Sequence, residues 1–159
     1  MLTEPGGRGH AALRDLVTTE LDPYNREGRN ISISGVDVVL MPKSGLSLAM
    51  AIHELASNAA KYGALSIPAG QLAVSWTVGD LPGDMLSFLW VETGGPPLAG
   101  PPAQRGFGTT LIERTLTHEL DAVVNREFLS SGLRCAINIP LTAETGEVRR
   151  FGGQREKRR

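Results

Sequence analysis

LSLAMAIHELASNAAKYGAL, residues Leu46–Leu65, is the stretch of sequence that decides the fold. Its apolar side chains recur every three or four residues, as on one face of an amphipathic helix: Leu48, Ile52, Leu55, Ala56 and Ala59. Pro42 and Ser44 precede this pattern, Ser44 as a candidate N-cap. Gly63 follows the pattern, where a left-handed residue would end a helix. These signals predict a helix over about residues 45–62.

A row of three polar side chains runs beside the apolar face. Glu54, Asn58 and Lys61 are four and three residues apart, so they stack on one face of the predicted helix. A solvated helix face usually carries several Lys and Glu pairs, whereas this row holds one acid, one amide and one amine. The row therefore favours a functional site, although it does not establish one by itself.

The composition is that of an ordinary globular domain. The 159 residues are 41% hydrophobic and 21% charged, enough for one domain with its own core. No apolar run approaches the roughly 20 residues that span a bilayer, and the N-terminus lacks a signal-peptide pattern. We therefore expect a cytoplasmic domain without membrane contact. The single cysteine, Cys135, excludes an internal disulfide; its alternating surroundings favour a buried strand residue, with a reactive thiol as the alternative.

The net charge of −1 is unevenly spread along the chain. Residues 144–159 hold six basic and three acidic side chains, which gives this segment +3 and leaves −4 for the rest. An acidic body argues against nucleic acid as a partner. We expect a domain over residues 11–141, preceded by a linker or the end of another segment at 1–10. Residues 142–159 are expected to form a basic, disordered tail, with a docking role as the alternative.

Periodicity predicts two further helices and three pairs of strands. The helices are expected at Ala11–Leu21 and from Gly108 onward, and the strands at Asn30–Ser34, Val36–Met41, Leu72–Val78, Met85–Glu92, Ala122–Phe128 and Leu133–Ile139. Short connections within the pairs imply a mainly antiparallel sheet with helices on one face, an α+β fold of two layers. The strand ending at Glu92 is apolar at odd and even positions, which predicts a central strand covered on both faces. The chain has no Rossmann alternation and no P-loop.

Two features near the predicted strand ends point to a ligand. Glu92 terminates a buried face, so its carboxylate must find a partner or a ligand unless it emerges into solvent. Gly94–Gly106 contains four glycines and four prolines; a mobile loop closing a pocket is favoured over a proline-rich ligand. Gly106–Thr110 then opens a helix whose free amides would suit phosphate, although a G-x-G alone is weak evidence.

These motifs, in this order, resemble the ATP-binding domain of the gyrase, chaperone and histidine kinase superfamily, the Bergerat fold. His53–Leu65, HELASNAAKYGAL, and Trp90-Val91-Glu92 followed by Gly94-Gly95-Pro96 resemble the defining boxes of the HWE family of bacterial sensor histidine kinases. The resemblance runs from about Leu2 to Pro140. It implies a two-layer α/β sandwich with ATP and Mg²⁺ as cofactors.

The resemblance implies a role for each residue of the helix row. Asn58 would be the Mg²⁺ ligand, Glu54 the carboxylate that polarises the attacking group, and Lys61 a neutraliser of phosphate charge. Tyr62 would line the nucleotide. Glu92 would accept a hydrogen bond from the adenine amino group and so disfavour guanine by roughly 1 to 3 kcal/mol.

The remaining implied nucleotide contacts lie in the glycine-rich turns and the lid: Gly94, Gly95, Arg105, Gly106, Gly108 and Thr109. Arg105 has a solvated lid position as its alternative. His53 matches the histidine after which the family is named. It lies about 100° around the helix from Glu54, so three roles stay open for it: direct catalysis, orientation of a neighbouring group, or packing.

The resemblance also implies partners. The γ-phosphoryl group would pass to a histidine on a dimerisation domain absent from this chain, and then to the receiver domain of a response regulator. The chain would be either a fragment of a longer kinase or a free-standing domain acting in trans. The alternatives are a non-catalytic ATP-binding or docking module, and a serine/threonine kinase of the same fold.

Overall fold

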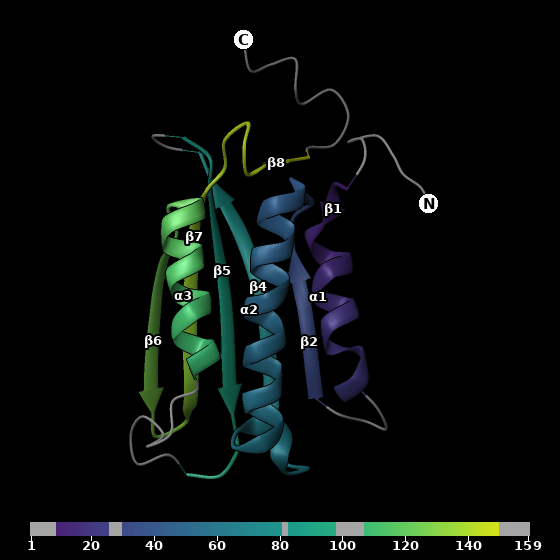
Figure 1. Ribbon diagram of the computed structural model, residues 1–159. Helices are drawn as coiled ribbons and strands as arrows, with labels where there is room; N and C mark the ends of the chain where they lie inside the picture. The colour runs from purple at the N-terminus through teal and green to yellow at the C-terminus, as the bar shows by residue number, and fades with distance from the viewer. Residues whose placement is uncertain (1–8, 26–29, 81–82, 98–106, 150–159) are drawn as a thin grey trace.

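Three helices lie in one layer against one face of a sheet in the computed structural model, which describes residues 9–25, 30–80, 83–97 and 107–149. Helix α2 lies between α1 and α3 and contacts both (Figure 1). The elements in chain order are β1 (Ala11–Ala12), α1 (Leu13–Leu21), η1 (Asp22–Tyr24), β2 (Asn30–Gly35), β3 (Val38–Leu40), α2 (Pro42–Lys61), η2 (Ala64–Ser66), β4 (Gln71–Gly79), β5 (Met85–Thr93), α3 (Phe107–Leu120), β6 (Val123–Leu129), β7 (Gly132–Pro140) and β8 (Gly146–Val148).

The main sheet has five strands in the order β2-β4-β5-β7-β6. Strand β2 pairs with β4 in parallel, and the other three neighbouring pairs are antiparallel. The fold is therefore the predicted two-layer sandwich, with a mainly antiparallel mixed sheet and helices on one face.

The prediction that residues 30–41 form a pair of neighbouring strands is wrong. Strand β3 leaves the main sheet and joins a second sheet with the order β1-β3-β8. The reason lies at the end of β2, where the Trp76 indole nitrogen donates to the Val36 carbonyl at 2.7 Å. A Cβ on Gly35 would overlap the Trp76 ring, so glycine lets this ring cross the strand end. The chain then turns away, and β2 pairs with β4 across the α2 crossover.

The prediction of a disordered tail from residue 142 is also wrong for its first part. Strand β8 pairs antiparallel with β3, and the Arg149 amide donates to the Asp37 carbonyl at 2.7 Å. The turn before β8 is closed by Thr145, a buried side chain whose hydroxyl donates to the Pro140 carbonyl at 2.7 Å. Pairing across about a hundred residues of sequence has no local signal, which is why the basic composition misled the prediction. Residues 150–159 lie outside the described part of the chain.

Helix α2 confirms the central prediction but not its caps. It begins at Pro42, whose fixed φ and missing N–H suit the first helical position, so Ser44 lies inside the helix, buried, and caps nothing. Gly63 has φ −113° and ψ −145°, which is not left-handed. Helix α1 begins at Leu13 rather than at the predicted Ala11, because Ala11 and Ala12 pair with β3.

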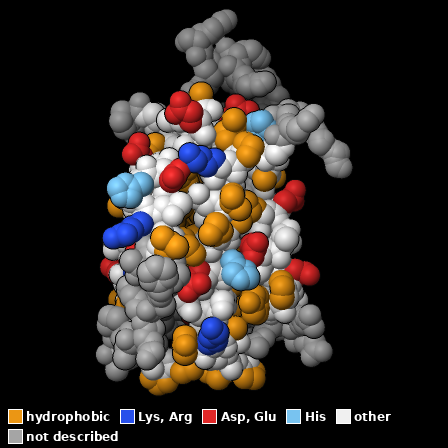
Figure 2. Space-filling model, viewed as in Figure 1, with side chains coloured by type: hydrophobic (Ala, Val, Ile, Leu, Met, Phe, Trp, Pro, Cys, Tyr) orange, Lys and Arg blue, Asp and Glu red, His pale blue; other side chains and the backbone are white. Residues whose placement is uncertain are grey.

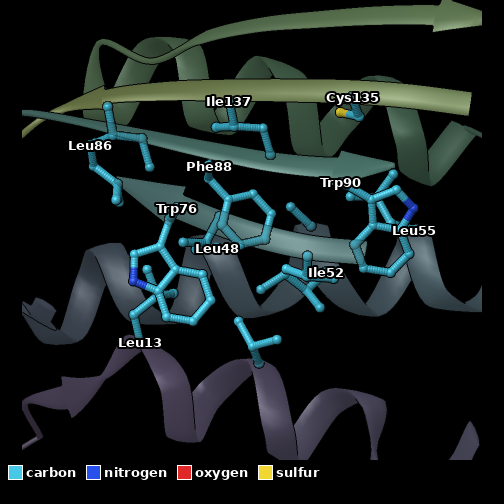
Figure 3. Close-up of a cluster of buried hydrophobic side chains, with 14 of the residues drawn as sticks. Leu13, Leu48, Ile52, Leu55, Trp76, Leu86, Phe88, Trp90, Cys135 and Ile137 are labelled. Atoms are coloured by element: carbon cyan, nitrogen blue, oxygen red, sulfur yellow. The ribbon is translucent and has the colours of Figure 1, made fainter. Parts of the chain in front are cut away.

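The core lies between the sheet and the helices (Figure 3). On β5 the even positions Leu86, Phe88, Trp90 and Glu92 are buried, whereas the odd positions are half-buried or exposed. The prediction that β5 is central is confirmed, but full cover of both faces is wrong, because all helices lie on one side. In the described part of the chain, none of the helices combines the length and apolar character needed to cross a bilayer.

Candidate functional site

The predicted polar row is present on α2 and begins with a contact between two of its members. The Asn58 side-chain NH₂ group donates to a Glu54 carboxylate oxygen at 3.5 Å, one helical turn away. Both residues are half-buried, whereas Lys61, in the last turn, is exposed. Because the amide nitrogen of Asn58 is turned to Glu54, its carbonyl oxygen is the atom left to bind a cation.

The row faces α3. Glu54 lines a small hollow between α2, α3 and strands β6 and β7, whose other lining residues include Leu55, Ile112 and Leu116. Figure 2 shows this helical face of the molecule, with acidic and basic side chains interspersed on it. Glu54 therefore lies beside the helix that follows the glycine-rich segment.

His53 faces the other side of α2. Its Nδ1 lies 3.2 Å from an Oε1 of Glu20 on α1, and its side chain is 69% exposed. This placement fits the packing alternative among the three roles that the sequence left open. It ties α1 to α2 at the surface, through a partner on α1 that is not among the predicted site residues.

Glu92 is the second centre of the site and is the one charged side chain among the described residues that is buried. Its Oε2 accepts a hydrogen bond from the Trp90 indole nitrogen at 2.8 Å, and its Oε1 accepts one from the Ala64 amide at 3.1 Å. Burial raises the pKa of Glu92, and the hydrogen bonds from Trp90 and then Ala64 oppose that rise. The carboxylate thus has a partner on each oxygen, which rules out the alternative that it emerges into solvent.

Glycines allow close packing at and near this carboxylate. A Cβ on Gly63 would overlap Glu92 Oε1, and a Cβ on Gly95 would lie 2.9 Å from the backbone of Ala64. Gly94 has φ +73°, a conformation that glycine adopts without strain. Gly63 is therefore needed for close approach to Glu92, which corrects its prediction as a helix terminator. Tyr62, beside it, has 52% of its surface exposed.

Two of the four residues predicted for the lid and the start of the following helix lie in the described part of the chain. Gly108 and Thr109 lie in the first turn of α3, as predicted for a helix start. Arg105 and Gly106 lie outside the described residues, as does most of the glycine- and proline-rich segment.

Sequence reasoning missed three contributors to the site: the Trp90 indole, the Ala64 amide and the close approach of Gly63 to Glu92. The signal for Trp90 was available, because residues two apart on a strand share a face. No local signal marks Ala64, since its amide reaches Glu92 only when η2 packs against the neighbouring strand β4.

The donor set fits a purine nucleotide with a bound cation. A carboxylate in its ionised form only accepts hydrogen bonds, which suits an amino group on a flat base passing close to glycine backbone. The Asn58 carbonyl oxygen is the kind of oxygen ligand that Mg²⁺ prefers. Lys61 adds a positive charge in the last turn of α2.

The sequence is related to part of several histidine kinases. Blue-light-activated histidine kinase 1 of Erythrobacter litoralis is 39% identical over 133 residues, which cover 82% of this chain and 36% of that protein. The blue-light-activated histidine kinase of Brucella ovis is 35% identical over 136 residues, 84% of this chain and 28% of that protein. The chain thus spans about a third of the length of these curated relatives. No family model matches it.

Solved structures show the same fold. The histidine kinase domain of the Erythrobacter litoralis EL346 blue-light-activated kinase superposes with a TM-score of 0.61 at 19% identity, covering 80% of this chain and 58% of that one. The mycobacterial sensor histidine kinase MprB superposes with a TM-score of 0.63 at 12% sequence identity, covering 88% of this chain and 98% of that one. The ATP-binding domain of PrrB from Mycobacterium tuberculosis superposes with a TM-score of 0.59 at 17% sequence identity, covering 84% of this chain and 97% of that one. By sequence, this chain is related to part of the blue-light-activated histidine kinases, and by fold it is similar to solved histidine kinase domains.

Proposed function

We propose that this chain is the ATP-binding catalytic domain of a two-component sensor histidine kinase. It binds Mg-ATP and transfers the γ-phosphoryl group to a histidine of a dimerisation domain, from which a receiver-domain aspartate takes it. The observation that carries the proposal is the buried Glu92 carboxylate, held by two donors and approached closely by Gly63 just after the end of α2.

Glu92 selects the base in this proposal. The adenine amino group donates to a free lone pair of its carboxylate, and Gly94 and Gly95 let the backbone lie against the ring. Guanine presents a carbonyl at that position and leaves the buried acceptor without a donor, which costs roughly 1 to 3 kcal/mol.

In this proposal the polar row on α2 binds the metal ion and the phosphates and accepts the proton released by the attacking histidine. Asn58 holds Mg²⁺ through its carbonyl oxygen, and Lys61 neutralises phosphate charge. Bound Mg-ATP supplies the phosphoryl group and its leaving ADP. Glu54 accepts the proton that the attacking imidazole loses as its nitrogen bonds to phosphorus. We assign His53 no contact with the nucleotide, because it pairs with Glu20 on α1.

The first test is calorimetric titration of the 159-residue chain with a non-hydrolysable ATP analogue, with and without Mg²⁺. We expect Mg²⁺ to tighten binding in the wild type, and Asn58→Ala to remove that gain, roughly tenfold or more. Asn125→Ala is the matched control, because Asn125 is exposed on β6. Equal Mg²⁺ dependence in both variants would contradict the role of Asn58.

A second test concerns the transfer itself. A helical dimerisation domain with an exposed histidine, incubated with this chain and ATP labelled at the γ-phosphate, should gain label that is lost in acid and kept in base. Label stable to acid would indicate a serine or threonine acceptor. Tight nucleotide binding without any transfer to histidine would favour the non-catalytic module.

A further inference from the structure

The two tryptophans of this chain donate their indole N–H hydrogen bonds to different kinds of acceptor. Both point from the sheet into the core, at opposite ends of it (Figure 3). The Trp76 indole nitrogen donates to a backbone carbonyl, that of Val36, at 2.7 Å. The Trp90 indole nitrogen donates instead to the carboxylate of Glu92 at 2.8 Å.

The Trp90 hydrogen bond is shielded from water. Trp90 is fully buried and Glu92 is 5% exposed, so neither group can exchange this bond for one with solvent. On the other oxygen, the Ala64 amide donates from η2 at 3.1 Å. The carboxylate is therefore held between β5 and the segment after α2, and both its position and its rotation are defined by two donors on two elements.

We propose that Trp90 is a positioning residue for adenine selectivity: its indole N–H fixes the Glu92 carboxylate in the orientation that receives the amino group of the base. This inference rests on the proposed nucleotide site and extends it to a residue that does not touch the nucleotide.

Packing alone does not require a tryptophan at this position. The neighbours of Trp90 across the sheet are Val74 and Cys135, and Leu55 of α2 is at the same end of the core. A phenylalanine would make much of the same apolar contact but would donate no hydrogen bond. The property that only tryptophan supplies here is the indole N–H.

The charge state of Glu92 gives the indole a second effect on selectivity. An ionised carboxylate accepts only, whereas a protonated one could donate to the carbonyl of guanine. Burial raises the pKa of Glu92, and the Trp90 hydrogen bond is the larger of the two influences that lower it again. The thiol of Cys135, which also interacts with Glu92, is kept neutral because burial raises its pKa to about 11.

The test compares Trp90→Phe with the matched variant Trp76→Phe, each as the full chain with Mg²⁺. Binding is measured calorimetrically for ADP, for GDP and for purine riboside 5′-diphosphate, which lacks the amino group. In the wild type and in Trp76→Phe we expect ADP to bind roughly tenfold or more tighter than the other two. In Trp90→Phe we expect this preference to fall to about threefold or less, through weaker ADP binding with the analogue unchanged.

The outcomes separate this inference from the proposed function. If the wild type binds ADP selectively and Trp90→Phe keeps the full preference, the positioning role is overturned and the nucleotide site stands. If the wild type binds none of the three nucleotides, both are overturned. Loss of affinity for all three in Trp90→Phe, by the same factor, would also overturn the inference, since it indicates a structural role alone.

A second measurement covers the case in which Trp90→Phe does not fold. In ¹⁵N-labelled wild-type protein the two indole N–H resonances are assigned from Trp76→Phe, which keeps one of them. We expect Glu92→Gln and ADP to shift the Trp90 resonance and leave that of Trp76 in place. A Trp90 resonance that responds to neither would contradict the inference.

Discussion

At the scale of single residues, the site depends on contacts that exclude even one methyl group. Gly63 lies against the Glu92 carboxylate so closely that a Cβ would overlap Oε1. The end of the Glu92 side chain can swing away more easily than the backbone can move. We therefore expect a substitution here to disturb the carboxylate first and the fold second.

Gly63→Ala should weaken adenine nucleotide binding roughly tenfold, because the displaced carboxylate loses the Ala64 amide donor. Calorimetric titration with ADP checks the affinity, and thermal unfolding checks the fold. The control is Gly79→Ala, where a Cβ would meet nothing within 4 Å. Equal ADP affinity in both variants would show that the carboxylate is not the group that holds the base.

At the scale of elements, the second sheet joins both ends of the described chain. Strand β3 pairs with β1 on one side and with β8 on the other, and Val38 and Leu40 of β3 are buried. The Met41 amide, just before α2, donates to the Thr145 carbonyl at 2.9 Å. The segment after Pro140 thus supports the start of the helix that carries the polar row.

Removal of residues 142–159 should lower the free energy of unfolding by about 2 kcal/mol or more, through lost backbone hydrogen bonds and the exposure of β3. Removal of residues 150–159 alone keeps β8 and should leave the free energy of unfolding close to that of the full chain. Urea unfolding followed by tryptophan fluorescence measures both. If the two truncations unfold at the same urea concentration, the β3 pairing contributes no stability.

At the scale of the whole molecule, the single cysteine of the chain is buried in the core. Cys135 is buried on β7, and burial raises the pKa of its thiol to about 11. The thiolate, which is the reactive form, is therefore scarce near neutral pH in the folded protein. Of the two interpretations that the sequence allowed for Cys135, this favours a buried strand residue over a reactive thiol.

A thiol reagent should accordingly label the native chain at pH 8 only as fast as the core opens, and label it at once in about 6 M urea. The time course of thiol release measures this, and Cys135→Ser supplies the blank. Rapid stoichiometric labelling of the native protein would mean that the Cys135 region is open, and would restore the reactive-thiol interpretation.

The sequence by itself determined the helices, most strand bounds and the face on which Glu54, Asn58 and Lys61 stack, because these depend on periodicity within a few residues. It also placed Glu92 at the end of a buried strand, since alternation shows which face a strand buries. These are local properties, so they could be predicted before any contact between distant segments was known.

Only the tertiary structure decided how β2, β3 and β8 pair, because hydrogen bonding between segments far apart in sequence leaves no local pattern. It also decided that His53 faces Glu20 and that Gly63 serves close approach rather than a left-handed turn. The Ala64 amide reaches the Glu92 carboxylate for the same reason, because η2 packs against β4 beside the strand that carries Trp90 and Glu92, a geometry that exists only in the folded chain.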